Sequence, residues 1–378
     1  MGLVALALYV HWPWCVHKCP YCDFNSRGGL FRIDEGRYIA ALLRDLSQTS
    51  CNALRPVTSV FFGGGTPSLM TEDGFDALMR GIRERVDLVD DIEVTLEANP
   101  GTVTEEKLAA FARSGVTRLS LGVQSFNEAS LSFLGRIHTA RQAREAVTWA
   151  KNTFAHVNID MMYALVGQTL ADLREDAEQA VSFNTDHLSY YELTIEPGSV
   201  FFKRPPEGLP DADTASDMAE CIQNITHQAG FDHYEVSAYA KVGSRCRHNL
   251  TYWTYGDYLA VGAGAHAKIT NSDGVIFREV RAKSPLRYMT DVENGTCVQR
   301  RRRVRPEEIP FEFMLNVLRL REGVAKERWE EATGLPYALI APKVASLQRE
   351  GLMEKTDCLV ATALGRRFLN TLQERFLP

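Results

Sequence analysis

The sequence has little that would mark a secreted, membrane-spanning or nucleic-acid-binding protein. Its apolar start, residues 3–10, is too short to span a membrane, so we expect at most peripheral membrane contact. No basic leader or cleavage site accompanies it, and it is interpreted as structure rather than as a signal peptide. A large excess of one charge is also lacking, because 42 Lys and Arg face 48 Asp and Glu for a net charge of −6. This balance argues against nucleic acid as a general partner.

Cysteines that look paired are also lacking. Of the eight cysteines, five are scattered without a pairing pattern and are interpreted as reduced thiols: Cys51, Cys221, Cys246, Cys297 and Cys358. A disulfide framework would need an oxidising compartment, which nothing else in the sequence supports. We therefore expect a cytoplasmic, reducing location.

The other three cysteines form a motif. Cys15, Cys19 and Cys22 have C-x3-C-x2-C spacing and follow the short apolar run, which is typical of a buried strand. Three thiolates can hold three irons of a [4Fe-4S] cluster and leave the fourth iron open to an outside ligand. Zinc is the alternative, although zinc sites more often use C-x2-C pairs and no second pair is visible.

Alternating strand and helix patterns predict a parallel α/β architecture. Strand-like runs recur with helical patterns between them: 3–10, 57–62, 92–96, 118–123, 157–163 and 187–193. Six such units fit a partly closed parallel barrel. A full eight-fold barrel is the alternative, but the pattern degrades after Pro197.

A basic run, residues 300–303, predicts a linker to a small C-terminal domain. Helical patterns follow at 312–320, 326–331 and 337–350, and strand patterns at 352–355 and 358–361. Three helices and a hairpin resemble a winged-helix module, whose usual role is nucleic-acid reading. The acidic chain favours a packing or lid role instead.

The cysteine spacing resembles the signature of the radical S-adenosylmethionine (SAM) superfamily. The resemblance implies that the amine and carboxylate of SAM chelate the open iron, while the radical chemistry belongs to the cofactor. Polar residues that follow the predicted strands are expected to converge over the cysteine loop. The candidates for SAM binding among them are Gly64, Gly65, Thr66, Glu97, Gln124, Arg136 and Asp160.

The chemistry of each candidate side chain or backbone segment suits a different part of SAM. The glycine turn at 63–65 lets backbone N–H groups approach a charged ligand closely, and Glu97 favours the cationic groups of SAM. Gln124 and Asp160 can hydrogen-bond ribose hydroxyls. Arg136 can form a bidentate pair with the SAM carboxylate.

Longer segments make the resemblance more specific. Four of them resemble the oxygen-independent coproporphyrinogen III oxidase family of radical SAM proteins: YVHWPWC at 9–15, GGGTPS at 63–68, GVQSF at 122–126 and NIDMMY at 158–163. By this resemblance Tyr9 also lines the SAM site, and Tyr21 lies near the adenine. One branch of the family contains coproporphyrinogen dehydrogenases, which decarboxylate propionates to vinyls. The other contains HemW-type proteins, regarded as haem chaperones.

Three features favour the HemW-type branch. Phe24 stands where the dehydrogenases carry a further Cys, and their long N-terminal extension is missing before Cys15. His248-Asn-Leu-Thr-Tyr252-Trp253 matches the H-N-x-x-Y-W motif associated with haem binding in that branch. Histidine is a common axial haem ligand, so His248 is predicted to contact haem. The alternative is a capped loop histidine.

One segment departs from the family pattern. Residues 163–168 are Tyr-Ala-Leu-Val-Gly-Gln, where the family usually has Tyr-Gly-Leu-Pro-Gly-Gln. The missing first glycine and proline can alter the loop over the SAM site.

The expected fold is therefore α/β, a radical SAM partial (β/α)6 barrel with a small, mostly helical, winged-helix-like C-terminal domain. We place the barrel and an extension carrying the haem motif at 1–299, and a HemN-type domain at 306–378. The expected function is a haem chaperone that binds haem, a [4Fe-4S] cluster and SAM. It passes haem to an acceptor haem protein, with a respiratory enzyme as one candidate. The alternatives are an oxygen-independent coproporphyrinogen III dehydrogenase and a radical SAM enzyme acting on another substrate; no catalytic residue is assigned.

Overall fold

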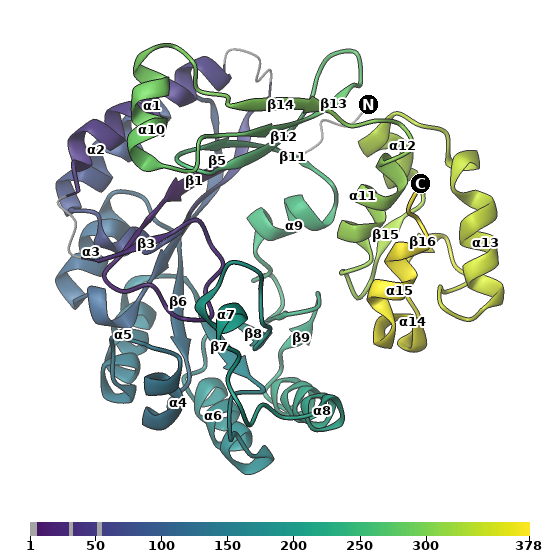
Figure 1. Ribbon diagram of the computed structural model, residues 1–378, viewed down its shortest axis with the longest axis horizontal. Coiled ribbons are helices and arrows are strands. Elements are labelled where there is room, and N and C mark those ends of the chain that lie inside the picture. The colour runs from purple at the N-terminus through teal and green to yellow at the C-terminus, as the bar shows by residue number, and fades with distance from the viewer. Residues whose placement is uncertain (1–5, 30–32, 51–54) are drawn as a thin grey trace.

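A curved sheet with helices on its outer side forms the larger part of the molecule (Figure 1). The computed structural model describes residues 6–29, 33–50 and 55–378. The first residues of the predicted strand at 3–10, and Cys51, lie outside this part of the chain. No helix in the described ranges is long and apolar enough to cross a membrane.

Parallel strands make up the middle of the sheet. The order of all twelve strands is β14-β13-β12-β11-β1-β4-β5-β6-β7-β8-β10-β9. The parallel strands are β11 (Asp257–Val261), β1 (Leu6–Trp12), β4 (Val57–Gly64), β5 (Leu88–Ala98), β6 (Arg118–Gln124), β7 (His156–Tyr163) and β8 (His187–Glu192). Strands β6, β7 and β8 alternate apolar and polar residues. Their polar residues Ser120, Asn158 and Ser189 line a cavity on the inner side of the sheet.

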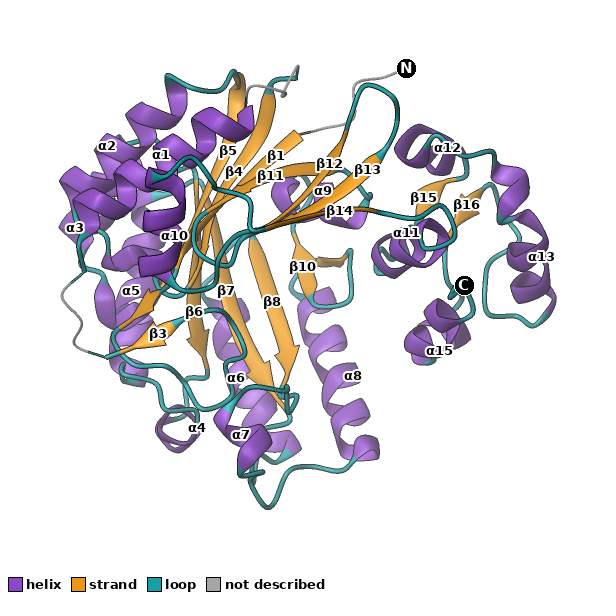
Figure 2. Cartoon of the chain, turned by 45° about the horizontal axis from the view of Figure 1, so that its top comes forward, coloured by secondary structure: helices purple, strands orange, loops and turns teal. Residues whose placement is uncertain are grey.

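Helices join the parallel strands and cover the outer side of the sheet (Figure 2). They are α1 (Glu35–Ser50), α2 (Glu72–Arg83), α3 (Glu105–Arg113), α4 (Glu128–Phe133), α5 (Ala140–Thr153) and α6 (Leu170–Ser182). Two later helices, α8 (Ala212–Gln228) and α10 (Pro285–Glu293), pack against α6 and α1. The short α7 (Val200–Lys203) lies at the cysteine loop instead, where the Phe201 N–H donates to Pro20 O at 3.0 Å. Four of these helices begin at a threonine whose side chain accepts a backbone N–H, as N-caps do: Thr71, Thr104, Thr139 and Thr169. The six predicted strand–helix units are thus confirmed.

The sheet extends beyond these units at both edges. Antiparallel β10 (Ala238–Ala240) and β9 (Asp232–His233) follow β8, and β12 (His266–Thr270), β13 (Ile276–Val280) and β14 (Arg300–Arg303) follow β11. The predicted linker at 300–303 is wrong, because these arginines form the exposed edge strand β14, paired with β13. An edge strand can carry charge on every side chain, so its composition resembles that of a linker.

The C-terminal domain is mostly helical, as predicted. It contains α11 (Ile309–Val317), α12 (Glu327–Thr333), α13 (Ala341–Arg349), α14 (Ala363–Arg367) and α15 (Leu369–Glu374). The last two helices were not predicted. The predicted hairpin is present in a shorter form, because an antiparallel bridge joins Met353 to Ala361 and the Glu354 N–H donates to Val360 O at 3.0 Å. The second half of this hairpin, β16 (Cys358–Leu359), also pairs with β15 (Val324–Ala325), which was not predicted. Phe313 and Trp329 lie in the core of this domain.

Helix α9 (Arg247–Trp253) carries the histidine motif and lies on the inner side of the curved sheet (Figures 1 and 2). It packs against β4, β11 and β1. The short strands β2 (Trp14–Cys15) and β3 (Arg27–Gly28) pair with each other and close the cysteine loop. These two features place the motif and the loop at the inside of the sheet.

Candidate functional site

The three motif cysteines line one cavity. Cys15 ends β2, and the loop to β3 brings Cys19 and Cys22 beside it; all three are half-buried free thiols. The cavity has a volume of about 500 Å³. Its lining includes eight of the ten residues predicted to bind a cofactor: Tyr21, Gly64, Gly65, Thr66, Glu97, Gln124, Arg136 and Asp160. The strand ends therefore converge as their parallel arrangement predicts.

The donor set fits an iron–sulfur cluster. Among the residues that the structure describes, no three His, Cys, Asp or Glu side chains converge on one metal ion. A cluster needs no such convergence, because each thiolate binds a different iron. Burial raises the pKa of the Cys15 and Cys22 thiols, so metal binding must displace their protons.

The glycine turn lies directly against the cysteine loop. The Gly65 and Thr66 N–H groups donate to the carbonyl oxygens of Trp12 and Trp14, at 2.7 and 2.8 Å. Gly64 has φ +110°, and a Cβ there would lie 2.3 Å from the His11 ring. Only glycine adopts this conformation at this distance, so the turn requires Gly64.

Glu97 presents a buried carboxyl group to the cavity. Its Oε2 accepts the Gly64 N–H at 3.1 Å, and it has no ion pair among the described residues. Burial, and then the nearby Asp160 carboxylate, raise the pKa of Glu97 to about 8. Asp160 accepts hydrogen bonds from Ser120 Oγ at 2.9 Å and Asn158 Nδ2 at 2.8 Å. A cationic ligand bound beside Glu97 would pair with its carboxylate and so favour the ionised form.

Arg136, in the loop between α4 and α5, lies between the end of β6 and the cysteine loop. Its Nη2 donates to Gly122 O at 2.6 Å, and its Nη1 lies 3.5 Å from both Cys19 Sγ and Tyr21 Oη. Its Nε is buried without a hydrogen-bond partner in the described part of the chain. Gln124 stands at a register shift between β6 and β7 with φ 73°. An unsatisfied buried donor and a strained backbone are features of ligand sites.

A larger cavity adjoins the first. It has a volume of about 720 Å³ and shares five lining residues with the smaller cavity: Lys18, Asp23, Phe24, Gly64 and Glu97. Tyr9 was predicted to line the SAM site, but it lines this larger cavity and not the smaller one. Its hydroxyl shares a hydrogen bond with His11 Nδ1 at 3.0 Å, which turns the phenol toward His11.

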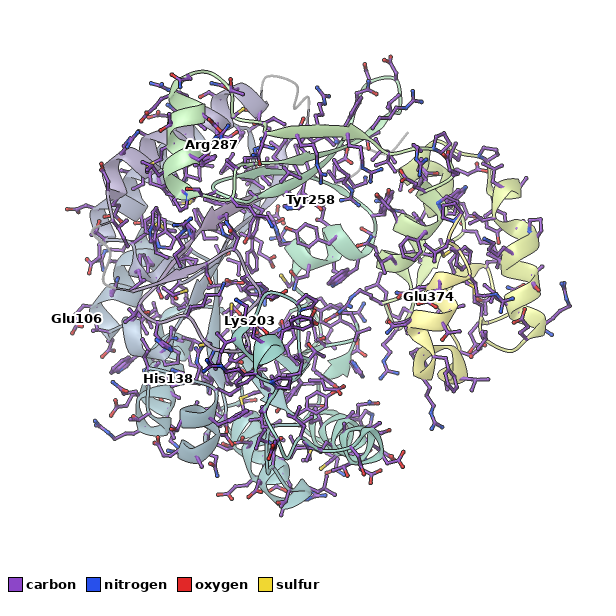
Figure 3. The ribbon with its side chains drawn as sticks, in the orientation of Figure 1. Glu106, His138, Lys203, Tyr258, Arg287 and Glu374 are labelled. Atoms are coloured by element: carbon purple, nitrogen blue, oxygen red, sulfur yellow. The ribbon has the colours of Figure 1, made fainter. Side chains whose placement is uncertain are left out.

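Aromatic side chains form a wall of the larger cavity. Tyr252 and Trp253 come from α9, Tyr258 comes from β11, and Tyr255 lies between them. The Tyr252 and Tyr258 rings meet edge to face, with centroids 4.6 Å apart. In Figure 3, Tyr258 lies between α9 and the strands above it. This wall is suited to a flat, apolar ligand.

His248 is buried behind this wall. It is 0 % exposed and does not line either cavity. Its Nδ1 hydrogen-bonds Ser59 Oγ at 3.0 Å, its Nε2 hydrogen-bonds Tyr252 Oη at 2.7 Å, and burial lowers its pKa to about 3. Because both ring nitrogens are occupied, the predicted direct contact of His248 with haem has no support in this geometry. The motif reaches the cavity through Tyr252 and Trp253 instead.

The sequence interpretation missed the strands that complete the larger cavity. His266, Lys268 and Arg278 line it from β12 and β13, and Lys283 follows β13. These residues lie after the point where the parallel pattern degrades. The available signal was the alternation of polar and apolar residues at 266–270, His-Ala-Lys-Ile-Thr.

The fold and the site define the class of protein. A curved parallel sheet with a three-cysteine loop after its first strand is the arrangement of radical SAM proteins. Residues 9–180 match the model of the Radical SAM superfamily, and residues 304–368 match the HemN C-terminal domain.

The chain belongs to the HemW family within this class. It is 42% identical over 382 residues to "Heme chaperone HemW" of Haemophilus influenzae, over 99% of this chain and 98% of that protein. It is also 42% identical over 378 residues to "Heme chaperone HemW" of Escherichia coli, over 99% of both chains.

Two further proteins are similar to this chain at lower identity. "Radical S-adenosyl methionine domain-containing protein 1, mitochondrial" of Bos taurus is 36% identical over 93% of this chain and 82% of its own length. The structure of the E. coli coproporphyrinogen III oxidase HemN superposes with a TM-score of 0.83, at 21% identity, over 99% of this chain and 90% of that one. This last similarity shows a common fold.

Proposed function

We propose that this chain binds haem in the larger cavity and passes it to an acceptor haem protein. The observation that carries the proposal is that a cavity of about 720 Å³, walled by aromatic rings, adjoins the cysteine cavity. Its volume is in the range of cofactor sites, about 300–1,000 Å³. The names of the HemW relatives describe haem chaperones, and two rings of the wall, Tyr252 and Trp253, belong to the motif that this branch carries.

The smaller cavity holds a [4Fe-4S] cluster and SAM in this proposal. Cys15, Cys19 and Cys22 would ligate the cluster, which would supply the electron for SAM chemistry. Glu97 receives the SAM ammonium group, and Arg136 receives its carboxylate. The backbone of Gly64, Gly65 and Thr66 lies along the methionyl part. Gln124 and Asp160 face the ribose, and Tyr21 lies near the adenine.

The walls of the larger cavity match the two parts of a haem molecule. Tyr252, Trp253 and Tyr258 offer ring faces and edges to the porphyrin plane. Lys18 and Lys283 are cations that can receive the propionates. His248 holds Tyr252 in the wall, and a direct bond from its Nε2 to haem iron would require that hydrogen bond to break.

The acceptor is a haem protein, with a respiratory enzyme as one candidate, and the proposed location is the cytoplasm. Nucleic acid is not a proposed partner, because the chain has a net charge of −6 and two of the four arginines at 300–303 pair with nearby carboxylates: Arg301 with Glu279, and Arg302 with Glu308 and Glu312. Membrane contact, if a membrane-bound acceptor requires it, is peripheral.

A haem titration of the anaerobically reconstituted protein tests the proposal. We expect saturable binding of a single haem per chain by absorbance, and haem transfer to an added apo-haem protein. Tyr258→Ala should weaken binding, whereas Tyr337→Ala, outside both cavities, should not. Absence of saturable binding would overturn the proposal. Conversion of coproporphyrinogen with SAM and a reductant would show the dehydrogenase instead.

A further inference from the structure

One histidine of the larger cavity has a free imidazole. Of the two histidines that line this cavity, His11 shares hydrogen bonds with Tyr9 Oη at 3.0 Å and Asn25 O at 2.9 Å. His266, the first residue of β12, is exposed on the cavity wall. Its ring nitrogens have no hydrogen-bond partner among the residues that the structure describes. His266 can therefore bind a ligand without breaking an existing contact.

The phenols of the cavity are poorer metal ligands in this geometry. Tyr9 is bonded to His11 and Tyr252 to His248, and the Tyr258 hydroxyl accepts Arg278 Nη1 at 2.9 Å. Burial raises the pKa of each of these three phenols. They stay protonated, whereas iron binds tyrosine as phenolate.

The backbone before His266 is held in place by the cysteine loop. Asn25 Nδ2 donates to Ala263 O and Lys283 O, both at 2.9 Å. The Ala263 N–H donates to Tyr38 Oη at 2.9 Å, and the Gly262 N–H to Tyr288 Oη at 3.0 Å. The position of His266 is thus fixed relative to the loop that carries the cysteines.

A free cation accompanies His266. The Lys283 side chain is exposed in the same cavity and has no ion pair among the described residues. Lys268 and Arg278, by contrast, are paired with Asp257 and Glu312, both at 2.8 Å. Partial burial, and next the charge of Lys283, lower the pKa of His266, so its imidazole is neutral at neutral pH and has a lone pair to donate.

We propose that His266 is the protein ligand of haem iron in the larger cavity and that Lys283 pairs with a haem propionate. The inference rests on the proposed function and specifies its site. One imidazole and one ammonium group on the same wall recognise the two features that distinguish haem from a neutral aromatic ligand, the iron and the carboxylates.

Two porphyrins separate the roles of these residues in titrations of the cluster-reconstituted full chain. With haem, His266→Ala should lower affinity by about tenfold or more, since loss of even an outer partner of a metal ligand has such an effect. Its absorbance spectrum should change, and added imidazole should restore it. With iron-free protoporphyrin IX, His266→Ala should bind as the wild type does. Lys283→Gln should weaken binding of both porphyrins.

The controls separate failure of the site from failure of the function. His227→Ala removes another exposed histidine, on α8 outside both cavities, and should change nothing. Wild-type haem affinity and spectrum in His266→Ala would overturn this inference and leave the proposed function standing. No haem binding by any chain, including the wild type, would overturn both. Equal loss of haem and iron-free porphyrin in His266→Ala would also overturn the iron-ligand role.

Discussion

At the residue scale, burial sets the ionisation of the groups around both cavities. Glu97 has a pKa of about 8, so near pH 7 most of this carboxyl is protonated before a cation binds. His248 shows the opposite case, because burial keeps its imidazole neutral down to about pH 3. Both residues are buried ionisable groups, but one lines a cavity and the other lies behind its wall.

The ionisation of Glu97 makes SAM binding depend on pH. Only the carboxylate pairs with the ammonium group of SAM, and below a pKa of about 8 the free protein carries the protonated form. SAM affinity should therefore rise by up to about tenfold per pH unit between pH 6 and 7.5, before the α-amino group itself deprotonates. Glu97→Gln should bind SAM more weakly with a flatter pH profile, measured by anaerobic calorimetry. Equal slopes in both proteins would refute the assignment.

The burial of His248 is tested by stability against pH. The unfolded chain protonates this imidazole below about pH 6.5, but the native chain does so only near pH 3. Its contribution is thus present above pH 6.5 and lost as the pH falls, by up to about 1.4 kcal/mol per pH unit. The difference in free energy of unfolding between wild type and His248→Gln should shrink accordingly from pH 6.5 to 5. A difference that is constant with pH would mean that His248 has the same pKa in the native chain as in the unfolded chain.

At the element scale, the sequence predicts those strands and helices that are determined by short local patterns of residues. The strands β4 to β8 and their helices were predicted because each has an apolar run and a cap signal, and parallel strands bring residues such as Glu97 and Asp160 together. β11 depends on pairing with β1 from the far end of the chain. Residues 257–261 contain an apolar run, but nothing local indicates that they pair with β1 and so help to form the larger cavity.

Side-chain direction was the second gap in the prediction. Tyr9 was assigned to the correct strand, whereas no helix was predicted around His248. The cavity that each side chain faces depends on the register of β1 and the docking of α9. At Ala164 the prediction concerned the backbone, because the family usually has glycine there. Ala164 has φ 57°. The loop keeps the conformation that glycine favours, although the residue has changed.

The glycine turn restricts substitution through both its backbone conformation and the lack of space for a side chain. Gly64→Ala would place a Cβ 2.3 Å from the His11 ring at φ +110°, which should destabilise the chain by about 1–3 kcal/mol and weaken SAM binding. Gly36→Ala, on α1 with nothing within 4 Å of the new Cβ, is the matched control and should be neutral or slightly stabilising. Thermal melts and SAM titrations measure both effects. Unchanged SAM binding in Gly64→Ala would show that the turn is not required.

At the scale of the whole molecule, the C-terminal domain is part of the cavity rather than an appendage. Asn316 of α11 lines the larger cavity. Glu312 accepts hydrogen bonds from Arg278 Nη2 at 2.8 Å and Tyr255 Oη at 3.0 Å. Tyr255 and Ile276 belong to the core of the C-terminal domain. Figure 2 shows this domain beside β12 to β14 and α9.

Arg319 connects the domain to the aromatic wall and gives the test of this arrangement. Its guanidinium lies 4.3 Å from the Trp253 ring centre and pairs with the buried Glu235 at 3.0 Å. Arg319→Ala should release Trp253 and lower haem affinity by about threefold to tenfold, as loss of a cation–π contact of about 0.5–2 kcal/mol implies. SAM binding in the other cavity should stay unchanged.

Arg375→Ala is the matched control for this last prediction. Arg375 also pairs with a glutamate, Glu350 at 2.9 Å, but on the exposed side of the C-terminal domain. An exposed pair contributes little to stability, so haem affinity and melting temperature should stay close to those of the wild type. If Arg319→Ala and Arg375→Ala bind haem equally well, the C-terminal domain does not shape the cavity. A loss confined to Arg319→Ala, with an intact cluster spectrum, would show that it forms part of the haem site.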